Sequence, residues 1–276
     1  MTLRELLTDG RKSLQEAQIG EWDLDAWYLL EHVTGVRRAD YLLCPEREVT
    51  DGQAERYREL IRKRGTHVPL QHLTGSQEFM GLPFFVNEDV LIPRQDTEIL
   101  VEEALKYIRP GMRILDMCTG SGCILLSILK LAPGVSGVGV DISEPALHVA
   151  ERNRENLGVQ AELLHSDLFG QVQGTYDCIL SNPPYIPSGV VDTLMEEVRD
   201  HEPRQALDGR EDGLYYYRRI TELGPAYLSP GGMLFFEIGY DQADAVSGLM
   251  EEAFEQIRVI KDLAGLDRVV YGIRKA

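Results

Sequence analysis

The sequence predicts an α/β protein with a parallel, doubly wound sheet, preceded by a small helical bundle. Two patterns carry this prediction. From residue 111 onward, short apolar runs alternate with segments of helical periodicity, which is the pattern of a parallel sheet covered by helices. Residues 1–75 show helical periodicity alone. We therefore expect two domains, with the ligand of the second domain at the carboxyl ends of its strands.

The composition is that of a globular protein large enough for two domains, with 276 residues of which 43% are hydrophobic. No apolar stretch approaches the roughly 20 residues of a membrane span, and the N-terminus lacks the pattern of a signal peptide. We expect a cytoplasmic protein without a membrane partner. The four cysteines form no Cys-x-x-Cys pair and have no histidines at zinc spacing, which predicts reduced thiols and no metal.

The net charge of −17 arises from 28 basic and 45 acidic residues. So negative a surface repels phosphate backbones and weighs against stable binding of nucleic acid. Positive charge is concentrated in one segment of helical periodicity, which can be a basic patch or an ordinary solvated helix face. That segment contains Arg56, Arg58, Arg62, Lys63 and Arg64.

Three helices are expected within residues 1–75. Leucines at helical spacing mark the first over residues 3–14, and the second runs to Gly35. The third begins with a capping box formed by Thr50 and Gln53. Because no glycine loop or polar constellation occurs here, we expect this domain to recognise a substrate rather than to perform chemistry.

A change of period predicts a β-hairpin connector over residues 76–95. Its strands are expected at residues 84–86 and 90–92, on either side of turn residues 87–89. The helix that follows opens the larger domain, residues 96–276, with a proline and acidic residues at its start.

Seven strands are expected from residue 111 onward. The last two should be antiparallel neighbours, because too little chain lies between them for a crossover helix. The seven expected strands are residues 113–117, 138–141, 162–164, 176–182, 233–238, 257–260 and 268–271. Helices are expected at residues 124–131, 143–156, 214–227 and 243–254.

The segment Asn182-Pro183-Pro184-Tyr185 follows the apolar run of the fourth strand. Neither proline has an N–H for the sheet ladder, so the chain must leave the sheet at Asn182 with its carbonyls turned outward. Asn182 adds a side-chain carbonyl and Tyr185 adds a flat ring. Together these groups suit a planar NH₂, either of a carboxamide or of a nucleobase. The plainer interpretation is a rigid turn that ends a strand.

A glycine loop, Thr119-Gly120-Ser121-Gly122, follows the first strand, but Gly-x-Gly at that place suits several nucleotides. Leu125 stands where the dinucleotide fingerprint needs a small residue, and no Gly-Lys-Ser/Thr phosphate loop occurs. The loop by itself is therefore a weak signal.

Acidic residues at three strand ends strengthen that signal. Asp141 ends the second strand, where an acid can bind two ribose hydroxyls, and Asp167 with Phe169 could hold an adenine. Asp116 could meet the cationic methionine portion of S-adenosylmethionine (SAM). Each residue also has an ordinary interpretation, as a helix cap or as core. With Asn182 they would form one row at the strand ends.

These motifs, in this order, resemble the SAM-dependent methyltransferases that act on planar amino nitrogens. Further segments extend the resemblance over nearly the whole chain to the peptide chain release factor glutamine N5-methyltransferases, the HemK/PrmC family. Those segments are Gln77-Glu78-Phe79-Met80-Gly81-Leu82, Pro93-Arg94-Gln95-Asp96-Thr97-Glu98, and residues 201–214, which begin with His201-Glu202-Pro203-Arg204. One departure is Cys118, where the loop of the family commonly has glycine.

The resemblance implies a seven-stranded SAM-dependent methyltransferase (Rossmann-like) sheet with a small N-terminal helical bundle and a β-hairpin connector. It implies methylation of the glutamine amide nitrogen (N5) in the Gly-Gly-Gln motif of class-1 release factors, by a monomer. The implied SAM-binding residues are Asp116, Cys118, Thr119, Gly120, Ser121, Gly122, Asp141, Asp167, Phe169 and Asn182. The implied catalytic residues are Asn182, Pro183 and Tyr185, and these residues with Pro184 would bind the substrate.

Two other functions share part of this pattern. An adenine-N6 nucleic-acid methyltransferase has the same Asn-Pro-Pro-Tyr motif and would flip a base into the pocket, but the acidic charge and the absence of a target-recognition segment weigh against it. A SAM-binding regulator without catalysis would not need the intact motif.

Overall fold

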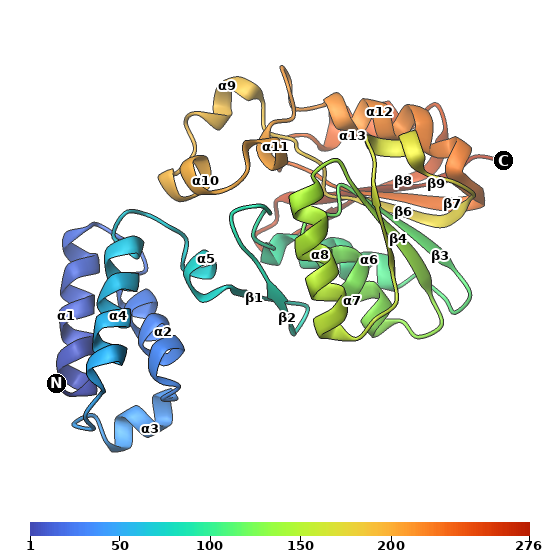
Figure 1. Ribbon diagram of the computed structural model, residues 1–276. Coiled ribbons are helices and arrows are strands. Elements are labelled where there is room, and N and C mark those ends of the chain that lie inside the picture. The colour runs from blue at the N-terminus through green and yellow to red at the C-terminus, as the bar shows by residue number, and fades with distance from the viewer. The chain divides into compact units, whose positions relative to one another are not determined.

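The computed structural model describes all 276 residues, which form two compact units (Figure 1). The first, called here the helical unit, comprises Met1–Ser76 together with Met195–His201. The second, called the α/β unit, comprises Gln77–Leu194 and Glu202–Ala276. No helix in either unit has the length and apolar character needed to span a membrane.

The helical unit packs three long helices around one apolar core. Its helices are α1 (Leu3–Glu16), α2 (Trp22–Thr34), α3 (Arg38–Leu43), α4 (Asp51–Arg64), α5 (Leu70–Thr74) and α10 (Glu196–His201). The expected capping box of α4 is confirmed, because the Thr50 hydroxyl accepts from the Gln53 N–H and the Gln53 side chain accepts from the Thr50 N–H. Buried leucines of α1 and α2 pack against Tyr57 and Leu60 of α4.

Gly10 of α1 lies directly against Tyr57 of α4. A Cβ at this position would lie 2.1 Å from the hydroxyl oxygen of Tyr57, which is buried and donates to the Ala26 carbonyl at 3.1 Å. We expect Gly10→Ala to lower the free energy of unfolding by about 1–3 kcal/mol, because the close-packed Tyr57 cannot move away cheaply. Gly52→Ala, at a position with open space on α4, should not destabilise. Urea unfolding of both variants checks this, and an equal effect on each would contradict it.

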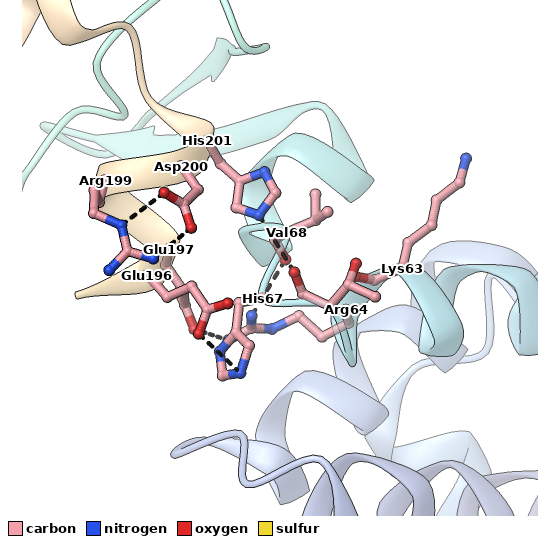
Figure 2. A network of polar contacts seen from close by, with 10 residues as sticks. Lys63, Arg64, His67, Val68, Glu196, Glu197, Arg199, Asp200 and His201 are labelled. Atoms are coloured by element: carbon pink, nitrogen blue, oxygen red, sulfur yellow. Dashed lines mark hydrogen bonds and ion pairs between the residues drawn. The ribbon is translucent and has the colours of Figure 1, made fainter.

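A buried arginine, Arg64, joins α4 to α2 and to α10, and Figure 2 shows its surroundings on the side of α10. Arg64, whose side chain is 4% exposed, donates from Nε to Asp25 Oδ2 at 2.7 Å and from Nη2 to Glu197 Oε1 at 2.5 Å. Its third donor, Nη1, reaches the Val68 carbonyl at 3.2 Å. Around this centre, His67 Nε2 lies 3.7 Å from Glu196 Oε2. Segment Met195–His201 therefore belongs to the helical unit through charge pairing, although it is distant in sequence.

The positive segment of α4 is mostly neutralised within the unit. Arg64 is buried in the pairing just described, and Arg56 and Lys63 both pair with Glu59, at 2.7 and 2.9 Å. The structure thus favours the solvated helix face over a basic patch for these residues.

The α/β unit has a seven-stranded sheet in the order β5-β4-β3-β6-β7-β9-β8, which confirms the expected fold class. Its strands are β3 (Arg113–Met117), β4 (Ser136–Asp141), β5 (Glu162–His165), β6 (Tyr176–Ser181), β7 (Leu228–Glu237), β8 (Phe254–Lys261) and β9 (Asp267–Arg274). Strands β3 to β7 are parallel, whereas β9 is antiparallel to both β7 and β8. The expected antiparallel pair at the edge is confirmed.

Helices cover both faces of this sheet, because successive strand residues alternate between two cores. Ile114 of β3 packs with the helices at residues 95–105 and 123–131, while its neighbour Leu115 packs with the helices at residues 215–223 and 243–250. The helices of the unit are α6 (Gln95–Leu105), α7 (Cys123–Leu131), α8 (Glu144–Leu157), α9 (Ser188–Val191), α11 (Arg204–Leu207), α12 (Tyr215–Leu223) and α13 (Ala243–Met250). Two 3₁₀ turns, Leu168–Gln171 and Gly224–Tyr227, complete it.

The connector forms a hairpin, but the expected hairpin turn at residues 87–89 and the expected strand at residues 90–92 were wrong. The two strands are β1 (Ser76–Phe79) and β2 (Leu82–Phe85), one stretch earlier than expected. Met80 and Gly81 form the two-residue turn, with φ of 53° and 71°. Two adjacent residues with positive φ suit the right-handed twist of a tight hairpin. Residues 87–89 form a local turn closed by the Asn87 side chain, and residues 90–92 are not a strand.

Candidate active site

A cleft opens at the carboxyl ends of β3, β4 and β6 in the α/β unit, which is where an open α/β sheet binds its ligand. Most of the residues singled out by sequence lie in its wall. The wall consists of Asp89, Val90, Leu91, Pro93, Thr97, Met117, Cys118, Thr119, Gly120, Ser121, Cys123, Ile124, Val140, Asp141, Ile142, Ser143, Ala146, Ser166, Asp167, Leu168, Asn182, Pro184, Pro203, Gln205, Ala206 and Tyr216.

Asp116 lies behind the glycine loop and not in the cleft wall, so the structure does not place it for direct contact with a ligand. Its carboxylate is fully buried and accepts from the Thr119 hydroxyl at 2.5 Å and from the Leu125 N–H at 3.4 Å. Burial raises the pKa of Asp116 to about 7, although the hydrogen bond from Thr119 opposes the shift. The carboxyl therefore fixes the loop against the start of α7. Gly122, the N-cap of α7, is likewise outside the wall.

The loop lies tightly against β4 because Gly139 has no side chain. A Cβ on Gly139 would stand 2.9 Å from the Thr119 hydroxyl oxygen, so a larger residue would push the loop outward. Thr119, Gly120 and Ser121 are thereby held at the cleft wall.

Cys118 has a φ of 63°, in the left-handed region that favours glycine. The departure from glycine noted in the sequence thus falls where the backbone would accept glycine without strain. The Cys118 side chain instead packs against the core on one face of the sheet. Burial raises the pKa of this thiol well above its usual value, and the carboxylates of Asp141 and Asp116 raise it further.

Asp141 ends β4 and faces the cleft with both oxygens held in place. Oδ2 accepts from the Gly120 N–H at 2.8 Å and Oδ1 accepts from the Ser143 N–H at 2.9 Å. Burial raises the pKa of Asp141, whereas these backbone donors lower it because they favour the charged form. Each oxygen keeps a second lone pair that can accept from a ligand hydroxyl.

Asp167 and Phe169, the two residues singled out after β5, lie in different places in the structure. Asp167 lies in the cleft wall, on a turn held by the buried Ser166 hydroxyl, which donates to the Leu168 carbonyl at 2.9 Å. Phe169 does not line the cleft: its ring stacks on Tyr227 with centroids 4.6 Å apart. A 3₁₀ turn at Leu168 directs Phe169 into the core, and Leu168 takes the place at the wall that sequence assigned to Phe169.

The Asn-Pro-Pro-Tyr segment leaves the sheet after Ser181, the last residue of β6. Asn182 and Pro184 line the cleft, while Pro183 and Tyr185 do not. Asn182 donates from Nδ2 to Thr97 Oγ1 at 3.3 Å, and no protein donor reaches its Oδ1 or the Pro183 carbonyl. Tyr185 packs against the core, and its carbonyl accepts from Gln242 Nε2 at 3.0 Å. The Asn182 Oδ1 therefore remains available at the cleft wall, and the Pro183 carbonyl next to it in the chain accepts no hydrogen bond from the protein.

The sequence patterns did not indicate the parts of the cleft wall that the connector, α6 and the chain after α10 contribute. These residues are Asp89, Val90, Leu91, Pro93, Thr97, Pro203, Gln205, Ala206 and Tyr216. The segments around Thr97 and Pro203 contributed to the family resemblance, and this resemblance was the signal in the sequence that could have pointed to them. No periodicity shows that they meet the strand ends.

Comparisons with known proteins identify the family of the chain. Residues 5–75 match the PrmC N-terminal domain family, and residues 95–201 match the methyltransferase small domain family. The chain is 40% identical over 280 residues to the release factor glutamine methyltransferase of Caulobacter vibrioides, covering 99% of this chain and 97% of that protein. It is 39% identical over 273 residues to the enzyme of the same name from Geobacter sulfurreducens, covering 98% and 96%.

A crystal structure of a methyltransferase from Pyrococcus furiosus shares the fold, with a TM-score of 0.55 at 16% identity over 72% of this chain and 91% of that chain. The full-length similarity to the two curated relatives is what decides the family. The chain belongs to the release factor glutamine methyltransferase family.

Proposed function

We propose that this protein transfers the methyl group of SAM to the side-chain amide nitrogen of the glutamine in the Gly-Gly-Gln motif of class-1 release factors. The main support is a pair of oxygens that follow β6, Asn182 Oδ1 and the Pro183 carbonyl, neither of which accepts a hydrogen bond from the protein. A carboxamide NH₂ offers two hydrogens, one for each. The substrate class is that of the full-length relatives, which are release factor glutamine methyltransferases.

The residues of the cleft suit SAM. Around Gly120 a Cβ would meet nothing within 4 Å, so a ligand can approach the loop closely. Asp141 keeps lone pairs for the two ribose hydroxyls, and Asp167 stands at the wall for an amino group of the base. When bound, SAM supplies a methyl group that its sulfonium makes electrophilic. We assign the methionine portion to the loop of Cys118, Thr119, Gly120 and Ser121.

The chemistry of an amide explains why placement dominates. The nitrogen lone pair is delocalised into the carbonyl, so the nitrogen is a poor nucleophile, and the cleft presents no strong base beside Asn182. Hydrogen bonds to Asn182 Oδ1 and the Pro183 carbonyl would hold the nitrogen in line with the methyl group and favour its partly pyramidal transition state. Such placement supplies about 7–11 kcal/mol at best. The nitrogen becomes acidic after transfer and then loses its proton.

We expect Asp141→Ala to weaken SAM binding by about 1.5–3 kcal/mol, because charge-assisted hydrogen bonds to the ribose are lost. The same change also frees the Gly120 and Ser143 N–H groups that the carboxylate now holds. Glu144→Ala, which removes an exposed acid in the first turn of α8, is the matched control and should leave affinity unchanged. Titration calorimetry measures both. Equal affinity of Asp141→Ala and the unmutated chain would make Asp141 purely structural.

The function is tested by incubating the full chain with methyl-labelled SAM and one acceptor at a time. The four acceptors are a class-1 release factor, the same factor with its Gly-Gly-Gln glutamine replaced by alanine, duplex DNA, and RNA. Label should enter only the intact release factor. Label in DNA or RNA would show an adenine methyltransferase instead. SAM binding without transfer to any acceptor would show a non-catalytic SAM-binding protein.

A further inference from the structure

Two buried side chains stand behind Asn182, and the mechanism so far does not use them. Thr97, in the first turn of α6, and Glu237, the last residue of β7, are each 2% exposed. Phe236 pairs with Ser181, so Glu237 and Asn182 are the next residues on neighbouring strands. Thr97 Oγ1 accepts from Asn182 Nδ2 at 3.3 Å. The Thr97 hydroxyl also lowers the pKa of the buried Glu237 carboxyl, as a donor to its charged form does.

The Thr97 hydroxyl has a single hydrogen, and this gives a direction to the series of hydrogen bonds from Asn182 through Thr97 to Glu237. A carboxylate can only accept, so an ionised Glu237 takes the hydroxyl hydrogen of Thr97. The Thr97 oxygen is then left to accept, and only the NH₂ edge of Asn182 can donate to it. Since Nδ2 and Oδ1 lie on opposite edges of the planar amide, the carbonyl oxygen is turned away from Thr97. It is the oxygen that no protein donor reaches.

A protonated Glu237 would not give this direction. A neutral carboxyl can donate to Thr97, whose hydroxyl could then donate to the carbonyl edge of Asn182 and turn its NH₂ toward the substrate. Two NH₂ groups facing each other cannot form the required hydrogen bond. Burial raises the pKa of Glu237 to about 7, while Thr97 and Arg268 lower it. Charged or titratable groups facing Glu237 from the packed elements are Arg94, Asp96, Cys123, Tyr185, Tyr217 and Arg268.

We propose that Thr97 and Glu237 are positioning residues that orient the Asn182 amide so that its carbonyl oxygen, not its NH₂, receives the substrate nitrogen. The proposal rests on the proposed function. Glu237 is a buried acid, and one of its oxygens has no partner in the protein. Its role would be to make the site specific for an NH₂ donor.

The first test replaces the hydroxyl of Thr97 in the full chain. Thr97→Val keeps the shape of the side chain but removes the hydroxyl that links Asn182 to Glu237, a link called here the relay. We expect kcat for release factor to fall by roughly 10- to 100-fold. The dissociation constant for SAM should change less than about threefold, because the cofactor contacts remain. Thr97→Ser keeps a hydroxyl and should retain most of kcat. Equal losses in Thr97→Val and Thr97→Ser, or a loss confined to SAM affinity, would overturn the proposal.

The second test uses pH and Glu237→Gln. In the unmutated protein kcat should rise as pH increases through about 7, since ionisation of Glu237 sets the direction of the relay. A glutamine can donate as well as accept, so Glu237→Gln should lower kcat and remove that rise. Persistence of the same rise in Glu237→Gln would assign it to another group and overturn the role of Glu237.

A third measurement does not depend on turnover. The ¹⁵N-labelled side-chain NH₂ of Asn182, assigned by its loss in Asn182→Ala, should shift with pH through about 7 in the unmutated protein but not in Glu237→Gln or Thr97→Val. A shift in all three proteins, or in none, would overturn the relay even where methylation proceeds. Failure of the unmutated protein to methylate release factor would instead count against the proposed function, so the two failures are distinguishable.

Discussion

Asn182→Ala should lower the rate of release factor methylation by roughly 10²- to 10³-fold, the usual cost of removing one hydrogen-bond partner that acts mainly in the transition state. The SAM dissociation constant should stay within about tenfold, because Asn182 is one of many residues in the cleft wall. The difference follows from its position: its Oδ1 is an acceptor beside the cleft that the protein leaves unused.

The rate and the affinity are separable by single-turnover kinetics and titration calorimetry. Asn156→Ala, which removes the same amide from an exposed position of α8, is the matched control and should alter neither quantity. If the whole loss in Asn182→Ala appeared in SAM affinity, Asn182 would be a cofactor ligand, and methyl transfer would not depend on placement by its amide.

Arg64→Ala should lower the free energy of unfolding of the helical unit by about 3–5 kcal/mol, because it leaves the carboxylate of Asp25 buried without a partner. The Asp25 side chain is 7% exposed, and burial raises its pKa while Arg64 lowers it. Glu197→Gln should cost far less, at most about 1 kcal/mol, because the Glu197 side chain is 36% exposed to solvent.

Tryptophan fluorescence reads this unit selectively, since both tryptophans of the chain, Trp22 and Trp27, lie in α2. Denaturant unfolding followed at these residues should show the loss in Arg64→Ala and no comparable change in Arg62→Ala, an exposed neighbour. Combining Arg64→Met with Asp25→Leu should recover most of the stability, because neither charge is then buried alone. A double variant as unstable as Arg64→Ala would show that packing, and not charge pairing, sets the effect.

The sequence predicted the sheet well because its strands are short, apolar and bounded by turn residues. The two prolines after Asn182 placed the end of β6 to within a residue, and the short stretch before the last strand predicted its antiparallel partner. The hairpin was misplaced because two apolar runs, residues 84–86 and 90–92, flank the polar residues 87–89, which is the pattern of a hairpin. The turn lies instead at Met80 and Gly81.

The parts of the site that sequence could not give depend on contacts across long separations. Thr97 meets Asn182 over 85 residues, and no local pattern records that contact. Asp116 and Phe169 were placed at the ligand because acids and aromatic rings at strand ends usually face it. A buried hydroxyl on Thr119 and a 3₁₀ turn at Leu168 direct these two side chains elsewhere.

The pairing of Arg64 with Glu197 makes the helical unit discontinuous in sequence. The chain passes between the units at three peptide bonds, after residues 76, 194 and 201, so a single cut near residue 76 does not separate them cleanly. Deleting residues 1–75 would also strip α10 of the surface on which it docks. Glu202 follows α10 directly, and Pro203 already lines the cleft. Loss of methylation in such a truncation would therefore combine two causes: removal of helices α1 to α5, which we propose recognise the release factor, and an untethered cleft wall. Glu197→Gln in the full chain isolates the second, because it weakens the tether and leaves helices α1 to α5 in place.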